Sequence, residues 1–555
     1  MAPSNDQYDF IIVGGGTAGC VLASRLIQRN QSLKIGLIEA GKDVTHHPHV
    51  SKPQDAPKLH FSEIDWAYTT VPQHHLDGKP RYNCGVKALS GGVAINSGGW
   101  VRGDALDYAE WSDRVSDKRW SYEGLLKYFK MTEHHFDPNA DPTQHGFDGP
   151  MYTSSASSSG RKYPLRKSIQ DAWSQIGLKQ VPDANNGSPT GFAELVENRR
   201  DGLRQLTSVV YPLNGVHVMT DTVVARVLIS EGDNTKSAVG VELADGHQLR
   251  IKPSGEVIVS SGAYRSPQVL LLSGIGNSSD LEKHGIEQQA HLPGVGQNLH
   301  DHLMVFRYWK LHHPEHGLAI GSPLMVDPAF AKGNPADWLA TMPIPHSGLK
   351  AAIERDESAS VSDDHVLLKG PRSHIESTVL YAVFGQEQIG LDIPLDGTAI
   401  MSFYLHGLPT SRGNISLQST DPTAPPIIDP NYNATQVDKF ALREGYRIMS
   451  RLFLDTPEGQ SIVKDEITPP GHGTLGSDAS DDLIDQRIKM GAISCYHPAG
   501  TCSMGKVVDS SLKVIGVNKL RVVDASITPV PLMGHYQAPV LAIAEQAVDI
   551  ILSDH

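Results

Sequence analysis

The chain has 555 residues, of which 39% are hydrophobic and 20% charged, and its formal net charge is −14. This composition is typical of a soluble globular protein with enough residues for two or three hydrophobic cores. The acidic balance argues against nucleic acids and anionic membranes as partners, because both are polyanions. The 4 cysteines are too few for a disulfide framework, and their spacing predicts no metal site.

The N-terminal segment MAPSNDQYDF has no charged region followed by a long apolar run and a cleavage site. We therefore expect no secretory signal and an intracellular, cytoplasmic protein. No run of 18 apolar residues occurs, so no membrane span is expected either.

A dinucleotide-binding fingerprint follows at once. Residues 9–13 (DFIIV) have the pattern of a buried parallel strand, residues 20–30 that of a helix, and residues 33–38 that of a second strand. Between the first strand and the helix, the run Gly14-Gly15-Gly16-Thr17-Ala18-Gly19 matches G-x-G-x-x-G. This complete βαβ context indicates a cofactor site rather than a glycine-rich turn.

Each position of the fingerprint has a physical task. Gly14 permits the tight turn, Gly16 lets the backbone approach a pyrophosphate, and Gly19 lets the helix pack closely on the sheet. The helix N-terminus offers free N–H groups and a positive dipole to the phosphates. Glu39, at the end of the second strand, can accept hydrogen bonds from ribose hydroxyls. The motif alone leaves FAD and NAD both open.

Two histidines near the C-terminus are the candidate acid–base residues. His497 lies in the run HPAGT, and His535 lies in the run GHYQAP, where helical or strand periodicity accounts for neither. Histidine suits proton transfer because its pKa lies near neutral pH. Adjacent imidazoles repel when both are protonated, so at least one should be neutral at pH 7. After them, residues 540–551 repeat apolar side chains at helical spacing.

Beyond the fingerprint, further segments resemble the glucose–methanol–choline (GMC) family of flavin oxidoreductases in the family's order. They are residues 37–41, 89–96, 224 within TVVARV, 261–276, 292–302, 411–413, 429–432, 497–501 and 534–539. The segment 89–96 departs from the family loop L-G-G-S-S-x-I-N at Ser90, Gly92 and Val93. Some family members attach the flavin through a histidine at the position of Ile95, so noncovalent FAD is implied here.

The resemblance implies an α/β chain, α+β overall, with a discontinuous Rossmann-like FAD-binding domain. That domain would comprise residues 1–45, 85–110, 205–310 and 480–555. Residues 130–204 and 311–479 would form a substrate-binding domain of antiparallel sheet and helices. Within the latter, residues 350–370 are polar and acidic, and we expect them to be a mobile loop near the entrance.

Motif and resemblance together assign the site residues. The expected FAD contacts are Gly14, Gly16, Thr17, Ala18, Gly19, Glu39, Ala40, Ser90, Gly91, Asn96, Val224, Asp524, Ala525, Gln537 and Ala538. His497 is the expected base, and His535 the expected hydrogen-bond partner of the substrate oxygen. Trp100 and Tyr496 are equally consistent with the pocket wall and with the core.

The resemblance implies oxidation of an alcohol, with proton abstraction at His497 and hydride transfer to flavin N5. Oxygen or another electron acceptor would reoxidise the flavin, and a monomer or homodimer is expected. An intracellular enzyme of this type would fit secondary metabolism. The alternative is a lyase on the same scaffold, similar to the hydroxynitrile lyases, in which FAD stays redox-idle. A light-driven decarboxylase is disfavoured, because that branch lacks the histidine found here at 497.

Overall fold

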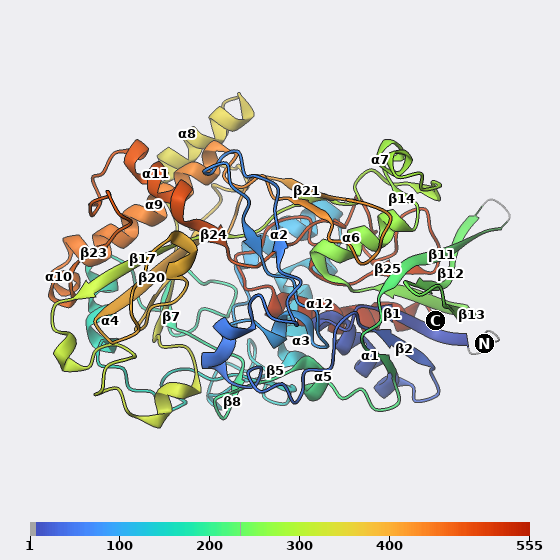
Figure 1. Ribbon diagram of the computed structural model, residues 1–555, viewed down its shortest axis with the longest axis horizontal. Helices are drawn as coiled ribbons and strands as arrows, with labels where there is room; N and C mark the ends of the chain where they lie inside the picture. The colour runs from blue at the N-terminus through green and yellow to red at the C-terminus, as the bar shows by residue number, and fades with distance from the viewer. Residues whose placement is uncertain (1–6, 233–234) are drawn as a thin grey trace.

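Two seven-stranded sheets organise the molecule, and they lie toward opposite ends of its long axis (Figure 1). The computed structural model describes residues 7–232 and 235–555. Both ends of the chain lie in the half that contains the first sheet, as the blue and red ribbons show. Residues from the two termini therefore contribute to one half of the molecule.

The first sheet has the strand order β10-β2-β1-β13-β12-β11, with β25 paired to β13. Pairing is parallel among β10, β2, β1, β13 and β25, and antiparallel among β11, β12 and β13. The strands are β1 (Gln7–Val13), β2 (Ile35–Ile38), β10 (His217–Met219), β11 (Val224–Gly232), β12 (Thr235–Leu243), β13 (Gln248–Val259) and β25 (Leu520–Val522). The parallel strands are apolar along most of their length because both faces of this part of the sheet are covered.

Helices from both ends of the chain cover this sheet. The helix α1 (Thr17–Arg29) follows the glycine motif, and α12 (Gln537–Ser553) packs beside it and beside α3 (Tyr122–Thr132). Arg25 on α1 and Glu545 on α12 form an ion pair of 2.8 Å. The helix expected at residues 540–551 is thus present, within the longer α12.

The second sheet is antiparallel, with the order β23-β17-β20-β19-β18-β7 and with β24 paired to β17. Its strands are β7 (Gly191–Glu194), β17 (Leu303–Leu311), β18 (Trp338–Met342), β19 (Ile375–Leu380), β20 (Ala399–His406), β23 (Val463–Ile467) and β24 (Ala492–Ser494). Helices on its outer side include α4 (Arg166–Gln175), α8 (His346–Glu357), α9 (Gln436–Ser450), α10 (Pro457–Ile462) and α11 (Asp481–Gly491). Side chains alternate along each strand, so one face packs on these helices and the other turns toward the first half of the molecule.

Further helices and small sheets lie outside the two large sheets. The helices are α2 (Ala105–Val115), α5 (Thr207–Val210), α6 (Gly262–Leu272) and α7 (Ser278–Lys283). A three-stranded sheet contains β16 (Gln297–Leu299), β21 (Gly413–Ser416) and β22 (Ile427–Asp429). Two-residue strands pair as β3 (Tyr68–Thr69) with β4 (Tyr82–Asn83), β5 (Glu133–His134) with β6 (Met151–Tyr152), β8 (Arg199–Arg200) with β9 (Leu203–Arg204), and β14 (Ile275–Gly276) with β15 (Ala290–His291).

The predicted fold class is confirmed: a Rossmann-like α/β half is joined to an antiparallel sheet with flanking helices. The residue boundaries of the two domains stay a prediction. The mobile loop expected at residues 350–370 is wrong, because residues 346–357 form α8, which packs on α9, and none of residues 350–370 lines the central cavity. The amphipathic spacing of Leu349, Ala352 and Ile353, which are buried, outweighs the polar composition of the segment.

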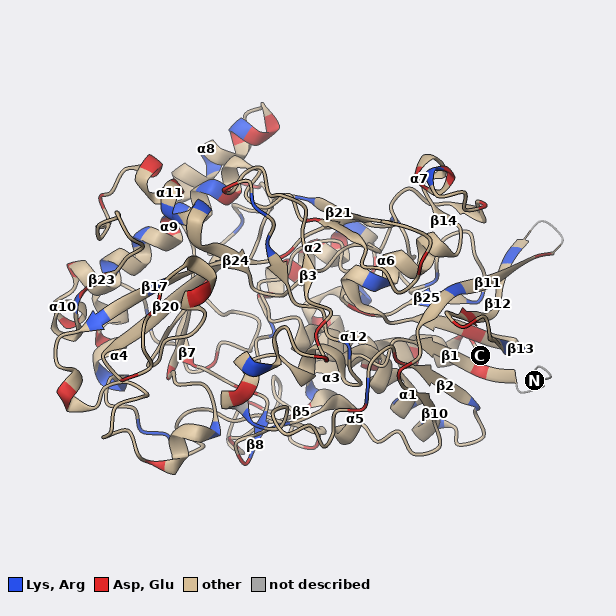
Figure 2. Cartoon of the chain, viewed as in Figure 1, with Lys and Arg blue, Asp and Glu red and all other residues tan. Residues whose placement is uncertain are grey.

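Charged residues of both signs lie interspersed on the outer helices, for example α7, α8 and α11 (Figure 2). Among the described residues, the structure contains no helix with the length and apolar character that crossing a membrane requires.

Candidate active site

A cavity of about 1080 Å³ lies between the two sheets. One end is lined by the glycine motif after β1, by Glu39 after β2 and by Asp524 after β25. The opposite wall is formed by β17, β18, β19 and β20 of the second sheet. Because the carboxyl ends of parallel strands meet at one edge of a sheet, segments far apart in the sequence converge at this cavity.

The glycine motif has the geometry that close packing requires. Gly14 has φ +104°, and a Cβ atom there would lie 2.4 Å from the carbonyl oxygen of Ser260. A Cβ atom on Gly19 would lie 2.0 Å from the carbonyl oxygen of Gly14, so any side chain would separate α1 from β1. Gly14, Gly16, Thr17 and Ala18 line the cavity, whereas Gly19 serves the packing of the helix.

Two buried carboxylates anchor the loops at this end. The side chain of Glu39 accepts hydrogen bonds from the backbone N–H groups of Gly15 (2.9 Å) and Gly41 (2.7 Å). Asp524 accepts from the backbone N–H of Gly262 (2.9 Å) and from the hydroxyl of Ser266 (2.6 Å). Burial raises the pKa of Glu39, although the backbone donors oppose that shift. Both residues also line the cavity, together with Ala40, Val224 and Ala525.

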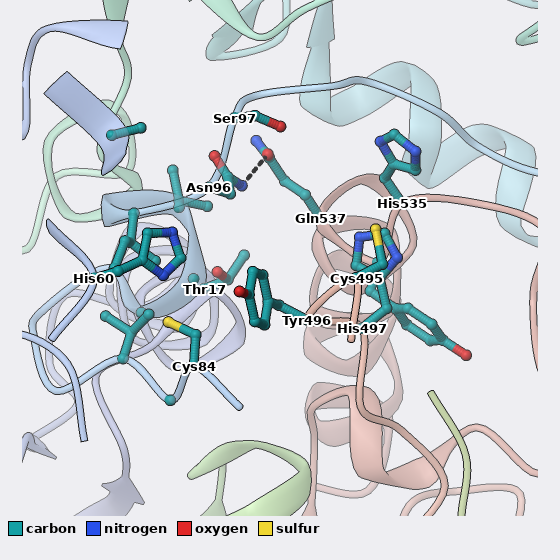
Figure 3. A pocket seen from close by; sticks show the side chains of 18 of the residues that line it. Thr17, His60, Cys84, Asn96, Ser97, Cys495, Tyr496, His497, His535 and Gln537 are labelled. Carbon is teal, nitrogen blue, oxygen red and sulfur yellow. Dashed lines mark hydrogen bonds between the residues drawn. The ribbon is translucent and has the colours of Figure 1, made fainter. Parts of the chain in front are cut away.

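Asn96 and Gln537 join the middle of the cavity to the start of α12. The side-chain amide of Asn96 donates to Oε1 of Gln537 at 2.7 Å (Figure 3). The Nε2 group of Gln537 is buried and has no hydrogen-bond partner within the described residues. A buried amide donor without a partner is costly, so this donor fits a polar group of a bound cofactor. The glycine cradle and this orphan donor together fit FAD.

Besides Gly19, two further expected cofactor contacts do not line the cavity. Ser90 is buried, and its hydroxyl pairs with that of Ser208 at 2.9 Å. Ala538 is also buried, and its N–H donates to the carbonyl oxygen of His535 at 3.2 Å. Ser90 instead acts through its backbone, because its φ of +86° turns the chain so that Gly91 lies against Gly16.

His497 and His535 both line the cavity, with ring centroids 5.2 Å apart (Figure 3). The segment of His497 follows β24, and Asp301 holds it: the N–H of His497 donates to the Asp301 carboxylate at 2.8 Å. The hydroxyls of Ser494 and Tyr432 donate to the same carboxylate. Desolvation, with repulsion from His302 and His535, holds the pKa of His497 well below 6.5. His497 is therefore a neutral imidazole at neutral pH.

A third histidine, His302, contacts the Nδ1 atom of His497. The Nδ1 atoms of His302 and His497 lie 3.0 Å apart, so one donates and the other accepts. Burial lowers the pKa of His302 to about 3, so it is neutral as well. When Nδ1 of His497 donates to His302, the lone pair of His497 is on Nε2.

His535 differs from His497 because a carboxylate faces it. Its Nε2 lies 2.7 Å from Oε1 of Glu376 on β19. Burial opposes the charged imidazole, but the charge and hydrogen bond of Glu376 outweigh it and raise the pKa of His535 above 6.5. The other ring nitrogen faces Gly99, where a Cβ atom would lie 2.6 Å from Nδ1. The pKa values of the two histidines are thus shifted in opposite directions, down for His497 and up for His535.

Sequence reasoning gave no site role to His302 or Glu376. His302 belongs to the run NLHDH, where two histidines flank a buried acid, and that pattern is a detectable signal. Glu376 is the second residue of the strand IESTVL, and its side chain is buried although strands seldom bury acids. The sequence left open whether Tyr496 and Trp100 lie in the pocket wall or in the core. Tyr496 lines the cavity and has a strained φ of +59°, and Trp100 is fully buried in the core.

Outside the cavity, the side chains of Glu133, His135 and His145 form a group with the residue types that bind metals. Their ligand atoms lie within 4.8 Å of one another. Arg102 pairs with Glu133 at 2.7 Å, and His145 bonds Glu133 and Asp183 through its two nitrogens. Although burial opposes it, these carboxylates raise the pKa of His145 to about 9. A protonated imidazole has no lone pair for a metal, so this group is an ion-pair network.

Comparisons with known proteins agree with this geometry. Family models described as GMC oxidoreductase match residues 8–304 and residues 409–544. The chain is 41% identical to GMC-type oxidoreductase acuG of Aspergillus aculeatus, over 98% of this chain and 99% of that protein. It is 32% identical to the mitochondrial choline dehydrogenase of Mus musculus, over 98% and 89%. A structure of Aspergillus oryzae formate oxidase that concerns FAD modification has a TM-score of 0.87 and 26% identity, covering 100% of this chain and 99% of that one.

Proposed function

The chain belongs to the GMC oxidoreductase family, and from that premise we propose that His497 is the base of its alcohol oxidation. Family membership makes the protein an FAD-dependent oxidoreductase acting on CH–OH groups. The observation that carries the proposal is a pair of adjacent histidines on one cavity wall whose pKa values shift in opposite directions, down for His497 and up for His535.

His497 takes the proton of the substrate hydroxyl on Nε2. Its lowered pKa keeps the imidazole uncharged at neutral pH, and we assign the donor role in the contact with His302 to Nδ1 of His497, which leaves the lone pair on Nε2. Asp301 fixes the backbone of the same segment through the N–H of His497. The base is therefore held in one orientation and one tautomer.

His535 stabilises the negative charge that develops on the substrate oxygen. A direct hydrogen bond from His535 to that oxygen was expected. Neither ring nitrogen is free to make it, because Nε2 bonds Glu376 and Nδ1 faces Gly99. We therefore assign its contribution to the positive charge, which acts across the 5.2 Å between the rings in a site shielded from water.

FAD, when bound, accepts the hydride from the carbon that carries the hydroxyl. The residues that would hold it are the glycine motif, Glu39, Asn96 and Gln537. Residue 95 is Ile and not the histidine that a covalent flavin link would use, and this supports noncovalent binding.

The test is anaerobic flavin reduction. A broad panel of alcohols should bleach the oxidised flavin of the purified holoenzyme, whereas a lyase would leave it yellow. His497→Ala should keep bound flavin and lose about 10²–10⁴-fold in the reduction rate. His472→Ala, at a surface loop, is the control and should change neither. Reduction at the wild-type rate in His497→Ala would refute this base.

A further inference from the structure

One wall of the cavity is a patch of the second sheet in which the strand register aligns side chains. Leu339, Thr378, Phe403 and Phe306 are consecutive cross-strand partners on β18, β19, β20 and β17. Leu380 and Met401 form the adjacent pair on β19 and β20. All of these side chains line the cavity. Residues two apart on a strand share a face, so the register makes one continuous surface.

This wall offers no free polar group within the described residues. Thr378 is its only hydroxyl, and that hydroxyl donates to the carbonyl oxygen of Trp338 at 2.6 Å. Glu376 is on the same face of β19, two residues away; its Oε1 bonds His535, its buried Oε2 has no hydrogen-bond partner among the described residues, and the residue does not line the cavity. The acid–base histidines therefore mark the polar end of the substrate space, and the sheet marks an apolar end.

The exposed residues that line the cavity include large apolar side chains. Asp327 and Glu387, the carboxylates that line this side of the cavity, are exposed, so water screens their charge. Phe61 and Leu395 also line it and are 67% and 52% exposed. Large apolar side chains in water near an apolar cavity favour the entry of an apolar molecule.

We infer that the substrate is an uncharged alcohol with a bulky aromatic or branched hydrocarbon body, which lies against the wall of Leu339, Phe306, Phe403, Leu380 and Met401. This inference rests on the proposed alcohol oxidation. An apolar body gains free energy by leaving water at this wall. A cationic alcohol would bury its charge against a wall that contributes no carboxylate to the cavity, and a sugar would leave several hydroxyls without partners.

The decisive experiment uses two substrates of the same shape. The body of 4-tert-butylbenzyl alcohol is isosteric with that of 4-(trimethylammonio)benzyl alcohol, and only the second carries a charge. Stopped-flow reduction of the holoenzyme should favour the neutral compound by at least about 100-fold in kcat/KM. A ratio near one, or a preference for the cation, would overturn the inference while leaving alcohol oxidation intact.

A wider panel separates the two proposals. Benzyl, cinnamyl and 4-tert-butylbenzyl alcohols should reduce the flavin, and glycerol and glucose should not. Reduction by the polar alcohols alone would contradict the apolar wall. If none of the alcohols reduces the flavin, the proposed function fails, and the inference fails with it.

A matched pair of variants assigns the effect to the wall. Leu380→Glu and Leu380→Gln introduce side chains of the same size that differ in charge. Leu380 is a partly exposed residue of the wall. At pH 8, the ratio of cationic to neutral kcat/KM should be at least about tenfold higher in Leu380→Glu than in Leu380→Gln. Equal ratios in two variants that keep their flavin would show that the substrate does not contact this wall.

Discussion

The carboxylate of Glu376 lies 2.7 Å from Nε2 of His535, and the exposed fraction of the Glu376 side chain is 1%. A strand of the second sheet thereby controls the charge of a residue that precedes the last helix of the chain. The two residues are 159 positions apart in the sequence, so the pair exists only in the folded molecule.

Glu376→Gln should lower the pKa of His535, because the amide keeps the hydrogen bond and removes the charge. Since we assign the protonated form of His535 to catalysis, the alkaline limb of the rate of flavin reduction should move to lower pH. We expect a loss of about tenfold at pH 8, which is ~1.4 kcal/mol. Stopped-flow rates across pH measure this, and an unmoved alkaline limb would argue against the role of Glu376.

The same pair affects stability with a defined sign. Because the folded state raises the pKa of His535, the stabilisation is complete below pH 6.5, the ordinary histidine value. It is lost as the pH rises through the raised pKa. Denaturant titrations should therefore show the largest difference between wild type and Glu376→Gln below pH 6.5, with a smaller one at alkaline pH.

His302 should act as a positioning residue that fixes the tautomer of His497. Asn and Leu are similar in size, but the Asn side chain can place an oxygen near the position of Nδ1 and accept the same hydrogen bond. His302→Leu should lose at least ~10-fold of the ~10²–10⁴-fold that a positioned base contributes. His302→Asn should recover most of it. Equal losses in the two variants would point to packing alone.

Gly99 should be intolerant of any side chain because His535 occupies that space. In Gly99→Ala the new Cβ atom would lie 2.6 Å from Nδ1 and 2.9 Å from Cε1 of His535, so the ring must turn away from Glu376. We expect about a 10- to 100-fold loss in the rate of flavin reduction, with flavin still bound. Gly473→Ala, which meets nothing within 4 Å, is the matched control. The prediction fails if the two variants have the same rate.

The flavin should leave the protein on denaturation, because Ile95 stands where a covalent link would need a histidine. Precipitation of the holoenzyme with acid should give a colourless pellet and a yellow supernatant. Flavin fluorescence that stays with the denatured chain in a gel would contradict noncovalent binding. Cys84, a free thiol that lines the cavity, would then be the first residue to examine by mass spectrometry.

The local sequence was sufficient for the features that depend on a few adjacent residues. The tight turn of Gly14, the strand before it and the acid after the second strand are neighbours along the chain, so one motif predicts the βαβ unit and its cofactor end. The fold class followed from that unit and from the family resemblance. Ser90 shows the limit of the approach, because its side chain turned out to bond Ser208, a partner far away in sequence.

The tertiary structure alone decided the charge states, the tautomer and the shape of the substrate space. The partner of His497 is His302, which immediately precedes β17, and the partner of His535 is Glu376 on β19; both pairs span long sequence separations. The apolar wall exists because strand register aligns single residues from β17, β18, β19 and β20. Burial and pairing set a pKa, and register sets a surface, so both depend on contacts that no local pattern encodes. The sequence by itself thus determined the cofactor and the candidate base, and folding determined how that base is held and what kind of molecule it meets.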